Sequence, residues 1–153
     1  MTSAITFFVP GDAVAQGSKQ AFVLPGTRRA VLVDAGRART HLKPWRVSVA
    51  YGAQAALAGR PWDQSRAIRL DCTFYFARPK SHYGSGKNAN VLKGSSPRAH
   101  TTKPDRDKLL RAVQDALTGA LYRDDSQVYA GNTLKLYCGE GQVPGVAVTV
   151  TAD

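Results

Sequence analysis

The sequence contains few cysteines and no long apolar segment. Its two cysteines, Cys72 and Cys138, are too few for the disulfide framework of a small secreted domain. The longest purely apolar runs are only a few residues long, whereas a helix needs about 20 apolar residues to span a bilayer. The first residues, MTSAITFFVPGD, lack the basic start of a secretory signal peptide. We therefore expect a soluble, unsecreted protein without membrane association, in a reducing, cytoplasmic compartment.

The composition is that of an ordinary globular chain. Hydrophobic residues make up 43% of the 153 residues and charged residues 21%, which excludes wholesale disorder. A domain of this size buries roughly 68% of its unfolded surface, enough for a core of its own. The expectation is one domain spanning residues 1–153.

Acidic residues are scarce and unevenly placed. Lys and Arg number 21 against 11 Asp and Glu, a formal charge of +10. Residues 1–104 hold 16 basic residues and four acids, whereas residues 105–125 hold four basic residues and five Asp. So positive a field favours a polyanion such as nucleic acid, because each neutralised phosphate releases counterions. Solubility, or another kind of anionic partner, is the alternative explanation.

Hydrophobic periodicity predicts an α+β order of elements. Apolar and polar residues alternate over 67–77, which makes this stretch the clearest strand. Helical spacing follows Pro44 over 45–57, and recurs over 105–119, where Gly119 marks the expected end. The other predicted elements are a strand at 4–9, a hairpin at 20–33 with its turn at 24–27, and strands at 127–138 and 145–151 that form an antiparallel pair. This order indicates an α/β fold of the α+β kind, a small mixed sheet with two main helices packed on it.

The segment 78–103 has no sustained periodicity and is long for a connection inside a compact domain. It is rich in Gly, Ser, Lys, Arg and His, and loops of this kind are usually functional or disordered. We expect it to cradle a DNA backbone, and its candidate DNA-binding residues are Arg78, Lys80, His82, Lys87, Lys93, Arg98 and Lys103. Tyr83 and His82 are candidates for stacking on unpaired bases.

Two pairs of carboxylates lie in the acidic segment. Asp105 and Asp107 are at the start of the second predicted helix, and Asp124 and Asp125 precede the next strand. If Asp105 is extended and Asp107 lies in the first turn, both can face one hard cation such as Mg²⁺. Convergence of the second pair on the same ion is a hypothesis. The alternative is that the first pair caps the helix, worth about 1 kcal/mol, and that the second forms a turn.

Arg111 and Asp115 follow Asp107 at intervals of one helical turn, on the side away from the apolar arc. The guanidinium of Arg111 could grip a scissile phosphate and stabilise the charge of its transition state. Surface ion pairs worth about 0.3 to 0.5 kcal/mol each explain the same row of residues. Both explanations stay open.

Three segments together resemble the RusA family of Holliday-junction resolvases, the crossover junction endodeoxyribonucleases. They are KPDRDKLLRAVQDAL at 103–117, DDSQV at 124–128 and, as in phage-type members, RPKSHY at 78–83. The resemblance implies a Mg²⁺-dependent nuclease of DNA recombination and repair, with Mn²⁺ able to substitute. It also implies a homodimer that binds four-way DNA junctions and nicks opposed strands, in the bacterial cytosol, with a phage or a cellular genome as its source.

By position, the resemblance implies that Asp105, Asp107 and Asp125 are catalytic carboxylates that bind the metal, with Asp124 as a supporting metal-site acid. Arg111 stands where the family has a catalytic Lys. It preserves the charge but cannot donate a proton near neutral pH, so proton transfer would need another group.

The resemblance shows one other departure and leaves the proton-transfer group to be identified. Lys108 stands where the family usually has Asn, which leaves the role of that amide open. His82 and His100 are candidates for the proton transfer that an arginine cannot perform.

Two further functions fit the sequence. One is a non-catalytic DNA-binding or packaging protein whose acids only cap a helix and form a turn. In that protein, Asp107→Asn and Asp125→Asn would leave every DNA-related activity intact. The other is a metal nuclease that cuts branched or flap DNA without preferring four-way junctions. The number of metal ions and the nucleotide step that is cut stay open.

Overall fold

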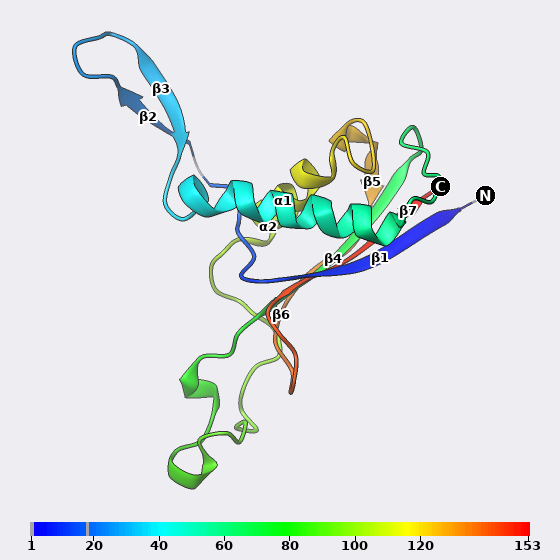
Figure 1. Cartoon of the computed structure of the whole chain (residues 1–153). Coiled ribbons are helices and arrows are strands. Elements are labelled where there is room, and N and C mark those ends of the chain that lie inside the picture. The colour runs from blue at the N-terminus through cyan, green and yellow to red at the C-terminus, as the bar shows by residue number, and fades with distance from the viewer. Residues whose placement is uncertain (1, 18) are drawn as a thin grey trace.

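The fold is a mixed β-sheet with two helices on one of its faces (Figure 1). The computed structural model describes residues 2–17 and 19–153. The strands of the sheet are β1 (Ser3–Pro10), β4 (Ile68–Phe76), β5 (Val128–Ala130), β6 (Thr133–Tyr137) and β7 (Gly145–Ala152). The helices are α1 (Ala38–Leu57) and α2 (Arg106–Leu117), and a separate hairpin consists of β2 (Lys19–Val23) and β3 (Ala30–Asp34). The predicted α+β fold is confirmed.

The order of the strands is β1, β7, β4, and both β5 and β6 pair with the remaining edge of β4. β7 runs antiparallel to its two neighbours, whereas β5 and β6 run parallel to β4. The prediction that the last two strand segments pair with each other is therefore wrong. Val146, Val148 and Val150 of β7 are fully buried, and such a valine face favours a central strand over an edge.

The predicted strand 127–138 is interrupted at Gly131. β5 ends before this residue and β6 begins after it. Gly131 has a φ of 147°, and a Cβ at this position would collide with the carbonyl oxygen of Leu70. The close approach of the two backbones therefore requires glycine.

Helix α1 begins earlier than the sequence predicts. Pro44 is predicted to open it, but the helix begins at Ala38 and the proline lies inside it, so this prediction is wrong. An interior proline costs roughly 3 kcal/mol, because it lacks a backbone N–H and crowds the preceding turn. Ala38 and Leu42 are only 6% and 3% exposed, and their burial offsets that cost.

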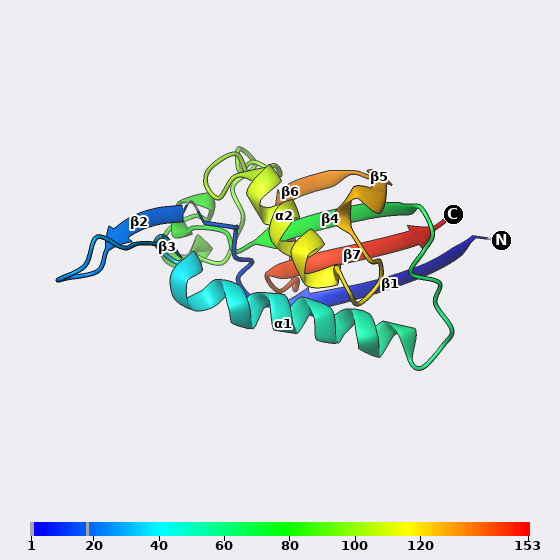
Figure 2. The ribbon, with the colours of Figure 1, turned by 90° about the horizontal axis from the view of Figure 1, so that it is seen from above.

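The core lies between the helices and the sheet. Alternate residues of β4 face the helices, and α2 contributes residues three or four positions apart. The buried set from these two elements includes Ile68, Leu70, Cys72, Phe74, Leu109, Val113 and Leu117. α1 runs beside β1, and α2 lies over the part of the sheet that contains β4 (Figure 2). Among the described residues, no helix has the length and apolar character needed to cross a bilayer.

Two segments project from this body (Figure 1). One is the hairpin of β2 and β3, whose predicted turn at 24–27 is confirmed by a 3.1 Å hydrogen bond from the Thr27 amide to the Leu24 carbonyl. The other is the long segment 78–103, which contains short 3₁₀ turns at Lys80–His82 and Gly86–Asn88. The start of α2 lies directly after this second projection.

Candidate active site

The start of α2 presents two exposed carboxylates. Asp105 precedes the helix with an extended backbone (φ −69°, ψ 140°), and Asp107 lies in the first turn. The Asp105 side chain makes no capping hydrogen bond, so the capping explanation fails for this residue. Its carboxylate lies 3.4 Å from the ammonium of Lys108, and half of the side chain is exposed. Both acids are therefore accessible to a ligand.

Asp124 has a structural role. Its carboxylate accepts a 2.9 Å hydrogen bond from the Ser126 amide, and the Gln127 side chain accepts a 3.0 Å bond from the Asp124 amide. Together they form a capping box at the short turn Asp125–Gln127. The hydrogen bonds from Ser126 lower the pKa of Asp124. The turn explanation therefore holds for Asp124, while the neighbouring Asp125 is exposed.

Replacing Asp124 by Ala should lower the melting temperature by a few degrees, because the turn loses its cap. Asp124→Asn should melt close to the parent protein, since an asparagine oxygen accepts the same bond. Circular dichroism melts would measure both, with Asp125→Ala as the neighbouring control. Equal melting of Asp124→Ala and the parent would contradict the capping role.

Helix α2 separates the two pairs of carboxylates. Asp105 lies beside the end of β4, whereas Asp125 precedes β5, which pairs with the start of β4. The 12 residues of α2 span about 18 Å, far more than one metal ion can bridge. Within residues 2–17 and 19–153, no three His, Cys, Asp or Glu side chains are grouped so that they could hold a metal ion. One chain thus places Asp105 and Asp107 at the same end of α2 and leaves Asp125 apart.

The oxygen donors of Asp105 and Asp107 suit a hard divalent cation chemically. Two carboxylates from one chain do not make a complete protein ligand set of the kind the sequence predicts. The carboxylate oxygens therefore suit a divalent cation in kind, but a single chain supplies fewer of these ligands than the sequence predicts.

Arg111 is exposed on α2, whereas Asp115 pairs with a residue of α1. The Asp115 carboxylate accepts a 2.8 Å bond from Arg46 of α1, whose same nitrogen also donates to the side chain of Gln16 at 2.6 Å. In the described part of the chain, Arg111 makes no ion pair within 4 Å. Surface ion pairing therefore does not explain Arg111, whose guanidinium is available to a ligand near Asp107.

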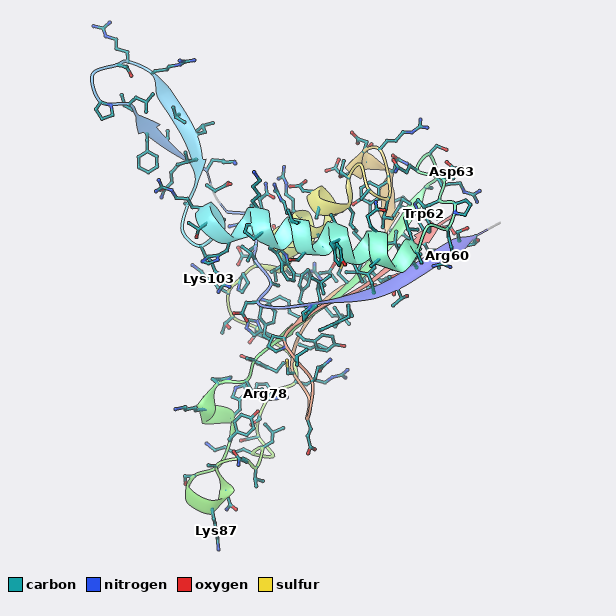
Figure 3. The ribbon with its side chains drawn as sticks, viewed as in Figure 1. Arg60, Trp62, Asp63, Arg78, Lys87 and Lys103 are labelled. Carbon is teal, nitrogen blue, oxygen red and sulfur yellow. The ribbon has the colours of Figure 1, made fainter. Side chains whose placement is uncertain are left out.

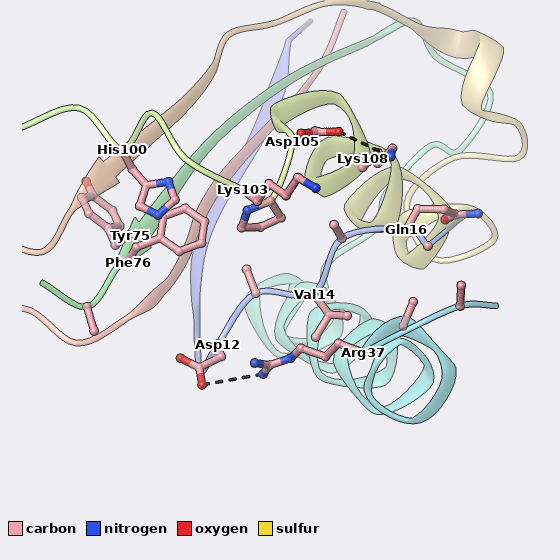
Figure 4. A pocket seen from close by; sticks show the side chains of 17 residues that line it. Asp12, Val14, Gln16, Arg37, Tyr75, Phe76, His100, Lys103, Asp105 and Lys108 are labelled. Atoms are coloured by element: carbon pink, nitrogen blue, oxygen red, sulfur yellow. Dashed lines mark ion pairs between the residues drawn. The ribbon is translucent and has the colours of Figure 1, made fainter. Parts of the chain in front are cut away.

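Asp105 also lines a cavity of about 620 Å³ (Figure 4). Phe76 and His100 lie on one side of it, with their ring centroids 4.0 Å apart and their planes 21° apart. Burial, and then the charge of Lys135, lower the pKa of His100, which favours its neutral imidazole. Lys103 and Lys108 bring positive charge to the same cavity.

The residues of segment 78–103 divide into two groups. Arg78 donates to the carbonyls of Cys138 (2.9 Å) and Pro97 (2.8 Å), lies 3.3 Å from a ring nitrogen of His82, and packs over Tyr137. Arg78 and His82 thus tie the base of the loop together. The five exposed cations of the loop are Lys80, Lys87, Lys93, Arg98 and Lys103. Figure 3 places Arg78 at the base of the projection and Lys87 at its far end.

Sequence reasoning missed the cavity itself. Its lining comes from the segment 12–17, the first residues of α1, the end of β4 and the approach to α2. No local pattern links these segments, and only the folded chain brings them together. The stacking of Phe76 on His100 could not be predicted from the spacing of these residues, because they are 24 positions apart in the sequence.

Comparisons with known proteins agree with these motifs. A family model described as "Endodeoxyribonuclease RusA" matches residues 23–151, which include both pairs of carboxylates. The chain is also 30% identical over 149 residues to "Uncharacterized protein YqaN" of Bacillus subtilis (strain 168). That match covers 97% of this chain and 98% of the other.

Proposed function

Because the chain belongs to the RusA family of endodeoxyribonucleases, we propose that it is a homodimeric, Mg²⁺-dependent nuclease that resolves four-way DNA junctions by paired nicks. Mn²⁺ can substitute for Mg²⁺ as the cofactor. The enzyme acts in DNA recombination and repair in the bacterial cytosol. The observation that carries this proposal is the pair of exposed carboxylates at the start of α2, in a chain of charge +10; the Asp105 side chain makes no capping hydrogen bond there.

Each side chain has a distinct part in phosphodiester hydrolysis. Asp105, Asp107 and Asp125 would hold the divalent cation, which would supply a bound water as the nucleophile and polarise the phosphate. The guanidinium of Arg111 donates to a phosphoryl oxygen as negative charge develops there. Lys108, where the family usually has Asn, acts on Asp105 through its charge, at the 3.4 Å separation of the ion pair.

A dimer would allow the third carboxylate to reach the other two. If a two-fold axis set the partner's α2 in the opposite direction, Asp125 of the partner subunit would approach Asp105 and Asp107. The same operation builds a second, identical site from the remaining residues. Two sites related by a two-fold axis suit the two opposed strands of a junction.

DNA binding rests on the exposed cations of the loop. Their charges contact phosphates, so affinity falls steeply with salt and depends on the shape of the DNA more than on its sequence. Because Arg78 and His82 are engaged inside the loop, they position its base, and the exposed lysines and Arg98 contact DNA.

The test compares three DNA substrates of shared sequence: a four-way junction, a flap and a linear duplex, each with and without Mg²⁺. Paired nicks confined to the junction and dependent on Mg²⁺ or Mn²⁺ are the expected result. Equal cleavage of the flap would identify a general branched-DNA nuclease. Tight binding to the junction without cleavage in either metal would identify a non-catalytic DNA-binding protein.

A further inference from the structure

The cavity beside Asp105 has the size of a small-molecule site. Its volume of about 620 Å³ falls within the range of roughly 300 to 1,000 Å³ that is usual for ligand pockets. It lies between the start of α2 and the segment 12–17, and it opens to solvent next to Asp105, one of the candidate catalytic carboxylates (Figure 4). A group that enters it is therefore adjacent to the proposed site of cleavage.

The wall formed by segment 12–17 is held in place. The Gln16 amide donates a 3.0 Å hydrogen bond to the carbonyl of Lys108 in α2. The Gln16 side chain accepts a 2.6 Å bond from Arg46 in α1. Gly17 packs so closely on Ala38 that a Cβ would lie 2.6 Å from that side chain. The cavity is thus bounded by fixed contacts to both helices.

The interior is aromatic and apolar on one side. The stacked rings of Phe76 and His100 offer a flat surface, and Val14, Ala15 and Pro104 contribute apolar lining. Nucleic-acid bases stack on surfaces of this kind, and the stacking tolerates any base because every base has a π face. The lining is unsuited to a duplex, whose bases are already stacked.

The rim is basic. Lys103 and Lys108 lie on the side of α2, and Arg37 lies across the opening (Figure 4). The Arg37 guanidinium is 3.6 Å from Asp12, in an exposed pair that a phosphate can displace. A nucleotide needs this combination: an apolar slot for the base and cations for the phosphate.

We propose that this cavity receives one unstacked nucleotide of the DNA substrate, with its base against Phe76 and its phosphate at Lys103 and Lys108. This inference rests on the proposed nuclease function and adds a source of selectivity to it. Taking a base out of a stack costs least where the base is already unpaired. The cavity therefore favours cleavage next to a branch point and disfavours an intact duplex.

The test measures binding of four-way junctions in which single nucleotides flanking the branch point are made abasic, one at a time. The Asp107→Asn background keeps the DNA uncleaved. At one position, loss of the base should weaken binding about tenfold, as expected for the loss of one base–aromatic stack. The abasic effect should fall below about twofold in Phe76→Leu, which removes the aromatic face, and in Ala13→Trp, which fills the cavity.

Val47→Trp introduces the same side chain on an exposed part of α1 and is the control, which should keep the tenfold effect. Circular dichroism checks the fold of each variant, and Phe76→Leu serves alone if Ala13→Trp does not fold. No base dependence at any position, or an unchanged tenfold effect in both cavity variants, would overturn the inference.

Cleavage by the protein with Asp107 intact separates the two proposals. Junction nicking together with a negative binding result overturns the cavity inference and leaves the nuclease standing. Base-dependent binding without nicking overturns the nuclease and keeps the nucleotide cavity. The loss of both binding and nicking overturns both proposals.

Discussion

Replacing Asp107 by Asn should abolish cleavage of a four-way junction, by at least about a hundredfold, while junction binding persists. The amide has the shape of the carboxylate but lacks the charge that holds a divalent cation. Asp107 is exposed in the first turn of α2, so the substitution removes only a favourable interaction with the helix dipole and the protein should stay folded. Removing one acid from so basic a chain should leave DNA affinity equal or slightly higher.

The matched control is Asp115→Asn, on the same side of the same helix. Asp115 pairs with Arg46 at 2.8 Å and contributes to the packing of α2 on α1. This control should lose some thermal stability and keep its cleavage rate at temperatures where it is folded. Gel assays of strand cleavage and of junction binding would measure both variants. Cleavage near the parent rate in Asp107→Asn, or loss of cleavage in folded Asp115→Asn, would contradict this assignment.

The parts of the fold that the sequence predicts are those with a strong local signal. The alternation of β4 and the apolar face of α2 mark their elements, because burial on one face imposes a period of 2 or of 3.6. The hairpin follows equally from its turn at 24–27. In each case the residues that decide the structure are neighbours along the chain.

The errors come from interactions between distant segments. Pro44 carries the usual sign of a helix start, but burial of Ala38 and Leu42 extends α1 in front of it. The place of β7 between β1 and β4 depends on which strands have a buried face on the folded sheet. The residue spacing within 127–138 and 145–151 does not determine which strands pair with β7.

The candidate site shows the same division. Adjacent residues correctly indicated that Asp105 is extended just before α2 and that Asp107 lies in its first turn. The position of Asp125 depends on the length and direction of α2, and this helix carries the chain away from the first pair. The cavity could not be predicted from local sequence patterns, because its aromatic and basic residues come from separate segments.

A dimer with one intact active site can be built if catalytic carboxylates come from both subunits. We expect purified heterodimers of Asp107→Asn and Asp125→Asn chains to nick junctions at about half the parental rate, although each variant alone is inactive. In the heterodimer, one site combines both substitutions, and the other combines the unaltered Asp107 and Asp125 of opposite chains. Such a dimer should cut one strand per binding event and make no paired nicks.

The reciprocal pairing gives the control. A parental chain joined to a chain carrying both Asp107→Asn and Asp125→Asn has no intact site if carboxylates are shared between subunits, and one intact site if they are not. Two different affinity tags allow each heterodimer to be isolated, and labels on all four junction strands allow single and paired nicks to be counted. Activity in the second heterodimer and none in the first would show that each subunit completes its own site. The separation of Asp105 from Asp125 along α2 leads us to expect the opposite result.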